Sequence, residues 1–138
     1  MKRGIPICLA GTVGLVLLTG KATPQSPTAT HIEPQSVFME NCAACHQAGG
    51  VGIPGVFPAL AADAFVRGDP SAVVRVILGG RNGMPSFRND LSDEQIAAVA
   101  SYIRQNFGNT SGPVAASLVA EVRARTNNPR TDNPPVSN

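Results

Sequence analysis

The amino-acid sequence predicts a small all-α fold, and three observations support the prediction. Several segments repeat apolar residues at the spacing of an α-helix and carry capping residues at their ends. No segment alternates apolar and polar residues as a half-buried β-strand would. All five Phe and the single Tyr of this 138-residue chain lie between Phe38 and Phe107, so the aromatic core belongs to one short stretch and to one domain.

The chain begins with a candidate secretory leader. A short basic start precedes an uncharged, largely apolar stretch, and Gly20 and Ala22 are small residues that suit cleavage after Ala22. We therefore assign residues 1–22 as a signal peptide, which predicts a periplasmic protein. The alternative is an uncleaved N-terminal membrane anchor, because the apolar stretch reaches the shortest length that spans a bilayer. Its proline and glycines disfavour that alternative, and we expect membrane contact only if the leader is uncleaved.

Removal of the leader changes the charge of the protein. Lys2, Arg3 and Lys21 leave with it, so eleven basic residues become eight against nine acidic residues, and the formal charge falls from +2 to about −1. The mature chain then contains no lysine. Binding to the phosphates of a nucleic acid requires a clustered positive face. The composition therefore excludes a nucleic-acid partner.

Four segments follow the leader. Residues 23–35 are polar and interrupted by prolines, which is typical of a flexible linker. A packed domain is expected over residues 36–109, and a C-terminal extension with a short helix over residues 110–126. Residues 127–138 lack apolar periodicity, and we expect a disordered tail there. A domain of this size has a marginal core of side chains alone, so another group is expected to contribute to it.

Four helices are expected within these segments. The first covers residues 36–45. The second begins at Asp69-Pro70, an N-cap followed by proline at the first helical position, and ends at Gly79-Gly80. The third begins with the capping box Ser92-Asp93-Glu94-Gln95 and continues with apolar residues at helical spacing. The last is a short helix over residues 115–125.

The most specific motif in the chain is Cys42-Ala43-Ala44-Cys45-His46. Two thiols on one helical turn reach the two vinyl groups of one porphyrin, and the adjacent imidazole then binds the iron. This C-x-x-C-H pattern is the attachment signature of c-type haem, so it predicts one haem c held by Cys42 and Cys45, with His46 as an iron ligand. A thioredoxin-like dithiol would need a βαβ setting, and a zinc site would need two further ligands. The other cysteine and the other histidine lie in the leader and the linker, which disfavours zinc.

The second iron ligand must come from a segment that folds over the opposite face of the haem. Met39, His31 and Met84 are the candidates. Met39 lies on the helix that carries the attachment motif, and His31 lies in the linker. Met84 lies in an expected loop over residues 79–91, between a glycine and a proline, which is a poor position for a residue that only fills a core. We therefore favour Met84 as the ligand over its alternative role as a core residue.

With these two motifs in this order, the chain resembles the class I cytochromes c, and the resemblance covers roughly residues 36–108. It implies a small fold of three core helices and several short helices wrapped around one covalently bound haem. It also implies that His46 and Met84 are the axial ligands of the iron. In such a fold Pro58 offers its carbonyl oxygen to the other ring nitrogen of His46, and Leu60 packs on the haem.

Three further segments are most similar to the single-haem modules found in cytochrome c subunits of periplasmic dehydrogenases that act on alcohols, gluconate or aldehydes. They are Phe57–Leu60, Arg81–Phe87 and the stretch that begins at Tyr102. Within the second of these segments, Arg81 and Asn82 either contact the haem propionates or are simply solvated.

The sequence therefore predicts an electron-transfer protein rather than an enzyme. The resemblance implies that it transfers single electrons outside the cytoplasm. A periplasmic dehydrogenase would be its donor, and an oxidase or another cytochrome of the respiratory chain its acceptor. The alternative is a haem enzyme or sensor, similar to a peroxidase, in which Met84 is a displaceable ligand.

Overall fold

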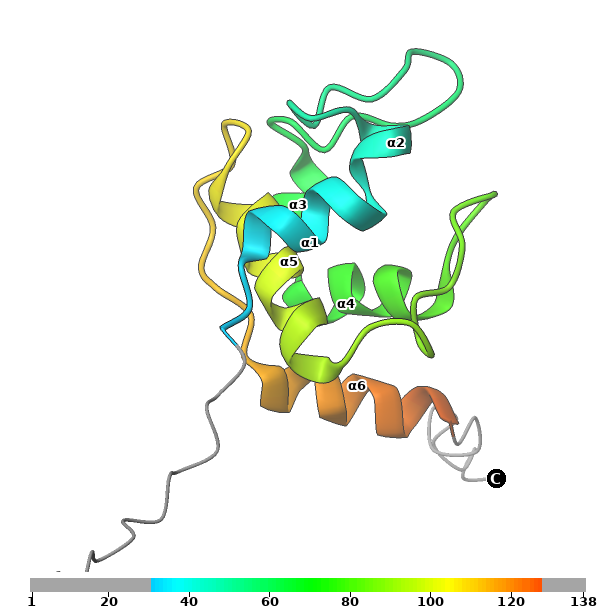
Figure 1. Ribbon diagram of the computed structural model, residues 1–138, viewed down its shortest axis with the longest axis vertical. Helices are drawn as coiled ribbons and strands as arrows, with labels where there is room; N and C mark the ends of the chain where they lie inside the picture. The colour runs from blue at the N-terminus through cyan, green and yellow to red at the C-terminus, as the bar shows by residue number, and fades with distance from the viewer. Residues whose placement is uncertain (1–30, 128–138) are drawn as a thin grey trace, which may run out of the picture.

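The computed structural model describes residues 31–127, and this part of the chain forms six helices, whose arrangement Figure 1 shows. The predicted leader (1–22), most of the predicted linker (23–30) and the predicted tail from residue 128 onward lie outside the described residues. The helices are α1 Pro34–Asn41, α2 Ala43–His46, α3 Ala64–Arg67, α4 Pro70–Gly79, α5 Asp93–Gln105 and α6 Ala116–Asn127. Between residues 31 and 127 the only β-type pairs are two isolated bridges, so the all-α prediction is confirmed.

The first predicted helix is divided in the structure into α1 and α2. Helix α1 begins at Pro34, two residues before the expected start, because proline suits the first turn, where its missing N–H needs no partner. Cys42 separates the two helices, with φ −121° and ψ −34°. Its N–H still donates to the carbonyl oxygen of Phe38 at 2.8 Å, so α2 continues almost directly from α1.

The capping residues predicted for α4 and α5 are confirmed. The carboxylate of Asp69 accepts a hydrogen bond from the N–H of Ser71, and Pro70 occupies the first turn of α4. At the start of α5, Ser92 and Gln95 form both hydrogen bonds of a capping box. Helix α3 was not expected from the sequence. Asp63 caps its start, because its carboxylate accepts a hydrogen bond from the N–H of Val66.

Three aromatic rings join the two ends of the domain. Phe38 of α1 lies with its ring centre 5.5 Å from that of Tyr102 on α5 and 5.1 Å from that of Phe107. Phe38 is completely buried, and α1 crosses α5 in Figure 1. This cluster fixes the segment that carries the cysteine motif against the longest helix of the domain.

Helix α6 closes the other side of the core. It begins one residue later than expected and ends at Asn127, the first residue of the predicted tail. Val119 and Val122 are buried, and the helix lies across α4 and α5 at the base of the molecule in Figure 1. The C-terminal extension is therefore part of the packed domain.

Replacement of Phe38 with alanine is expected to lower the free energy of unfolding of the haem-loaded protein by about 3–5 kcal/mol, because it leaves a cavity in the aromatic cluster. Unfolding in denaturant measures the change. Phe65→Ala is the matched control, since this ring is 42% exposed and its loss should cost less than about 1 kcal/mol. Equal losses in the two variants would contradict this packing.

Candidate haem site

His46 lies at the end of α2 and is held by a backbone carbonyl group. Its side chain is buried, and Nδ1 lies 2.9 Å from the carbonyl oxygen of Pro58. A carbonyl oxygen only accepts hydrogen bonds, so Nδ1 carries the proton and donates it. In the neutral ring Nε2 then keeps its lone pair, and it makes no hydrogen bond within the part of the chain that the structure describes. This arrangement suits a nitrogen that binds a metal.

Cys42 and Cys45 precede His46 on the same turn. Both are free thiols and both are partly buried. Burial raises the pKa of the Cys42 thiol to about 11, and the neighbouring Cys45 adds to the increase. Cys42 therefore stays protonated at neutral pH, and the pair lies on one side of the turn that ends at the imidazole of His46.

Two glycines allow the loop after His46 to fold back onto it. The N–H of Gly52 donates to the carbonyl oxygen of His46 at 2.9 Å, and a Cβ atom at Gly52 would lie 2.6 Å from the carbonyl oxygen of Pro58. The carbonyl oxygen of Gly50 accepts hydrogen bonds from Leu60 at 2.7 Å and from Ala61 at 2.9 Å. The missing side chain of Gly52 thus allows Pro58 to reach His46.

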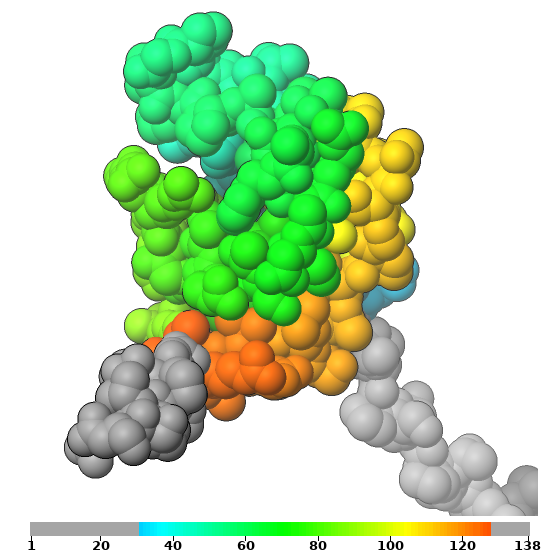
Figure 2. Space-filling model, turned by 180° about the vertical axis from the view of Figure 1, so that it is seen from behind, coloured from blue at the N-terminus to red at the C-terminus, as the bar shows by residue number. Residues whose placement is uncertain are grey.

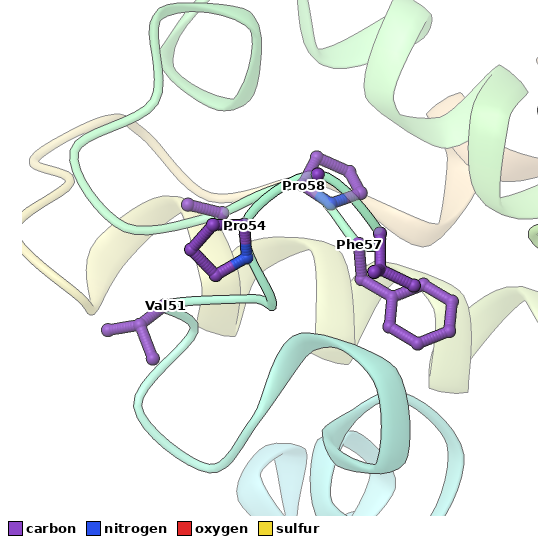
Figure 3. A pocket seen from close by; sticks show the side chains of 7 residues that line it. Val51, Pro54, Phe57 and Pro58 are labelled. Atoms are coloured by element: carbon purple, nitrogen blue, oxygen red, sulfur yellow. The ribbon is translucent and has the colours of Figure 1, made fainter.

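The outer part of this loop is apolar and exposed. Val51 and residues 54–59 line a shallow hollow of about 400 Å³ that contains no titratable side chain. Figure 3 shows Val51 and Pro54 together on one side of the loop, while Phe57 points away from them. Val51 and Val56 are 61% and 66% exposed, so the loop presents apolar side chains to solvent.

Asn109 is a buried residue of the site region that sequence reasoning did not select. Its Nδ2 donates to the carbonyl oxygens of Leu60 at 2.8 Å and Ile103 at 2.9 Å, and its Oδ1 accepts from the N–H of Asp63 at 3.1 Å. These bonds tie the end of α5 to the segment that contains Pro58. The sequence signal was weak, since it consists only of a polar residue directly after a glycine that ends a helix.

Met84 lies in the loop between α4 and α5, in a tight turn. The backbones of Arg81 and Met84 exchange two hydrogen bonds, of 3.2 and 2.9 Å. Asn82 and Gly83 stand at the tip with φ +48° and +88°, a conformation that an Asn-Gly pair favours in two-residue turns. Met84 is partly buried against the core, whereas Arg81 is exposed and its guanidinium lies 5.7 Å from the centre of the Phe65 ring.

The structure thus gathers the predicted site residues into two groups. One contains Cys42, Cys45, His46, Pro58 and Leu60, and the other contains Arg81, Asn82 and Met84. Figure 2 shows an open notch in the molecular surface between the loop that follows α2, in teal, and the loop that follows α4, in light green. The same two loops lie apart on one side of the molecule in Figure 1.

These residues fit a covalently bound haem. They offer two free thiols, a ring nitrogen with a free lone pair and, in the loop after α4, the thioether sulfur of Met84. A bare metal ion has no comparable donor set, because residues 31–127 contain no cluster of three or more His, Cys, Asp or Glu side chains suited to it.

Comparison with known proteins identifies the class. Residues 29–103 match the family model described as cytochrome C oxidase, cbb3-type, subunit III. The chain belongs to this family of cytochrome c domains, as the sequence motifs predicted. Membership implies one covalently bound haem c and a role in electron transfer rather than in enzymatic catalysis.

Two kinds of relatives are similar to this chain. Cytochrome c6 of Thermosynechococcus vestitus is 36% identical over 104 residues, which cover 74% of this chain and 89% of the relative. The cytochrome c subunit of the quinone-dependent alcohol dehydrogenase of Gluconobacter oxydans is 34% identical over 100 residues, or 63% of this chain and 21% of that subunit. The fructose dehydrogenase cytochrome subunit of Gluconobacter japonicus is 36% identical, again over 21% of its length. The chain thus spans about a fifth of these dehydrogenase subunits.

Solved structures are also similar, among them a cytochrome c6. Cytochrome c6 from the diatom Phaeodactylum tricornutum is 34% identical, and the match covers 54% of this chain and 90% of that protein with a TM-score of 0.47.

Among residues 31–127, none of the helices has the length and apolar character needed to cross a membrane.

Gly52→Ala is expected to displace the Pro58 carbonyl group from His46, because the added Cβ would lie within 2.6 Å of its oxygen. A weaker hydrogen bond makes the imidazole a poorer electron donor, so the reduction potential should rise and less haem-loaded protein should form. Gly55→Ala is the control, since Gly55 also has a positive φ but faces open space. Redox titration compares the two variants, and identical potentials would contradict the role of the contact.

Proposed function

We propose that this chain is a monohaem cytochrome in which Cys42 and Cys45 hold the haem, while His46 and Met84 bind the iron from opposite faces. The observation that carries the proposal is the hydrogen bond between His46 and Pro58. It fixes the imidazole at the end of α2 with Nε2 available, and Met84 belongs to the loop after α4, one of the two loops that border the notch in Figure 2. When bound, the haem supplies a one-electron couple between Fe(III) and Fe(II).

The residues of the chain set the reduction potential of this couple and keep other molecules away from the iron. A His/Met pair stabilises the reduced state more than two histidines do, which raises the potential. With His46 and Met84 both holding the iron, neither substrate nor oxygen would find an open position on it. We propose Arg81 as a contact of a haem propionate, since its exposed guanidinium lies beside the Met84 turn. Asn82 needs no propionate contact to explain its position, because it stands at the tip of that turn with a positive φ, which Asn tolerates.

The proposed donor is a periplasmic dehydrogenase, and the proposed acceptor is an oxidase or another cytochrome of the respiratory chain. The similarity to cytochrome subunits of alcohol and fructose dehydrogenases supports this direction of transfer. The exposed apolar side chains of Val51 and Val56 suit a small and transient contact between redox proteins. The predicted mature chain has eight arginines against nine acidic residues and no lysine, so it is nearly neutral and we expect little electrostatic steering of this contact.

Met84→Ala is expected to open the sixth coordination position of the iron. The reduced variant should bind carbon monoxide, and its potential should fall by on the order of 0.1 V, because the thioether no longer stabilises Fe(II). Met39→Ala is the control, since Met39 is 47% exposed on α1 and should change neither property. If the wild-type protein binds carbon monoxide as readily as Met84→Ala does, the iron is already open, and the enzyme or sensor alternative holds.

Export and cleavage are tested by the mass and location of the protein in its own host. The predicted leader 1–22 supports a soluble periplasmic form that begins at Thr23 and carries the mass of one haem. Osmotic release of the periplasm followed by intact-protein mass spectrometry measures both properties. A full-length chain that stays with the membrane fraction would show that the leader is an anchor.

A further inference from the structure

Helix α6 lies beyond the residues that match the family model, which end at residue 103. Val119 and Val122, near the middle of the helix, pack on the core. Its second half makes polar contacts with a different part of the chain, the segment 88–91, through which the chain returns from the Met84 turn to α5. Figure 1 shows the C-terminal end of α6 beneath this returning segment.

Arg123 of α6 makes two of these contacts and a third with the start of α5. Its Nε donates to the carboxylate of Asp93 at 2.7 Å, at the start of α5. Its Nη2 donates to the carbonyl oxygen of Leu91 at 3.1 Å, and its Nη1 donates to that of Arg88. Only 21% of the Arg123 side chain is exposed, so one half-buried guanidinium joins α6, the returning segment and α5.

Arg88 makes the reciprocal contacts from the returning segment. Its guanidinium donates to the side chains of Thr126 and Asn127 and lies 3.4 Å from the carbonyl oxygen of Arg123. A positive charge is favourable there, because the unpaired carbonyl groups of a helix end carry partial negative charge. Arg88 and Arg123 thus form an interlocked pair, in which each side chain donates to the backbone of the other residue.

The returning segment connects this pair to Met84. The hydroxyl group of Ser86 donates to the carbonyl oxygen of Leu78 at 2.6 Å, and the N–H of Phe87 donates to that of Ile77 at 3.1 Å. These bonds fasten the base of the loop to α4, whereas Arg81, Asn82 and Gly83 at its tip are exposed. The loop is therefore held at its base, on one side by α4 and on the other by α6.

We propose that Arg88 and Arg123 make α6 a brace for the loop that carries Met84. They are positioning residues that control how firmly Met84 holds the sixth coordination position of the iron. The inference rests on the proposed function, because it requires Met84 to be the ligand. It assigns to the C-terminal extension a role in the electron carrier beyond covering the core.

The test uses the full-length, haem-loaded protein with Arg88→Gln and Arg123→Gln. Imidazole is the probe, since it competes with Met84 for ferric iron, and the sulfur-to-iron charge-transfer absorption reports Met84 itself. Each variant is expected to bind imidazole about tenfold more tightly, as the loss of charged hydrogen bonds to the loop implies. Arg125→Gln is the matched control, because Arg125 pairs with Glu121 along α6 and should leave imidazole binding unchanged.

A second control distinguishes an effect on the Met84 loop from a general loss of folding stability. Asp69→Ala removes the cap at the far end of α4 and is expected to weaken the fold by about 1 kcal/mol without changing imidazole binding. The inference is overturned if both arginine variants bind imidazole as the wild type does, or if imidazole affinity follows unfolding stability through Asp69→Ala as well. A wild-type protein without the charge-transfer absorption would overturn the assignment of Met84, and the brace with it.

Discussion

The hydrogen bond between Nδ1 of His46 and the carbonyl oxygen of Pro58 is the contact on which the arrangement of the site depends. It requires the chain to turn sharply after His46 and to bring Pro58 back within hydrogen-bond distance of the imidazole. Gly52 makes that return possible, because a Cβ atom there would occupy the space of the Phe57 and Pro58 carbonyl groups. Asn109 then holds the next part of the segment against the end of α5. The packing of the domain thus fixes the orientation of the His46 imidazole.

The other half of the site depends on different parts of the chain. The Met84 turn stands at the tip of a loop whose base is fastened to α4 and, through Arg88, to α6. The two halves face each other across the notch of Figure 2, and the core outside that notch consists mainly of aliphatic residues on α4, α5 and α6. A domain of this size gains little stability from side chains alone, so a large apolar cofactor between the halves would also contribute to the core.

Local patterns explain which features the sequence could predict. The caps at Asp69 and Ser92 and the C-x-x-C-H motif each involve residues that are neighbours in the chain, and the first two match the structure closely. The brief interruption at Cys42 was missed, because both sides of it have helical composition. The family and its haem were predicted from the spacing of the cysteines, and the family match confirms them.

Contacts between distant segments were not predictable in the same way. Asn109 bonds to Leu60, 49 residues away, and no local pattern marks a polar residue that will be buried. Arg104 is a comparable case, since it is 5% exposed and donates to the carbonyl oxygens of Val66 at 2.6 Å and Gly68 at 2.9 Å. Nothing in the sequence around Arg88 and Arg123 distinguishes them from ordinary surface residues, and only the fold shows that they meet. Their roles depend on topology rather than on the residues beside them.

In the proposed cytochrome, His46 at the end of α2 and Met84 in the loop after α4 bind the same iron. Proton NMR of the reduced, haem-loaded protein with labelled methionine methyl groups tests it most directly, because the porphyrin ring current strongly shifts any methyl group bound at the iron. One methyl resonance is expected far upfield, assigned to Met84 by its persistence in Met39→Leu. Resonances of Met39 and Met84 that both lie in the normal methyl region would contradict it.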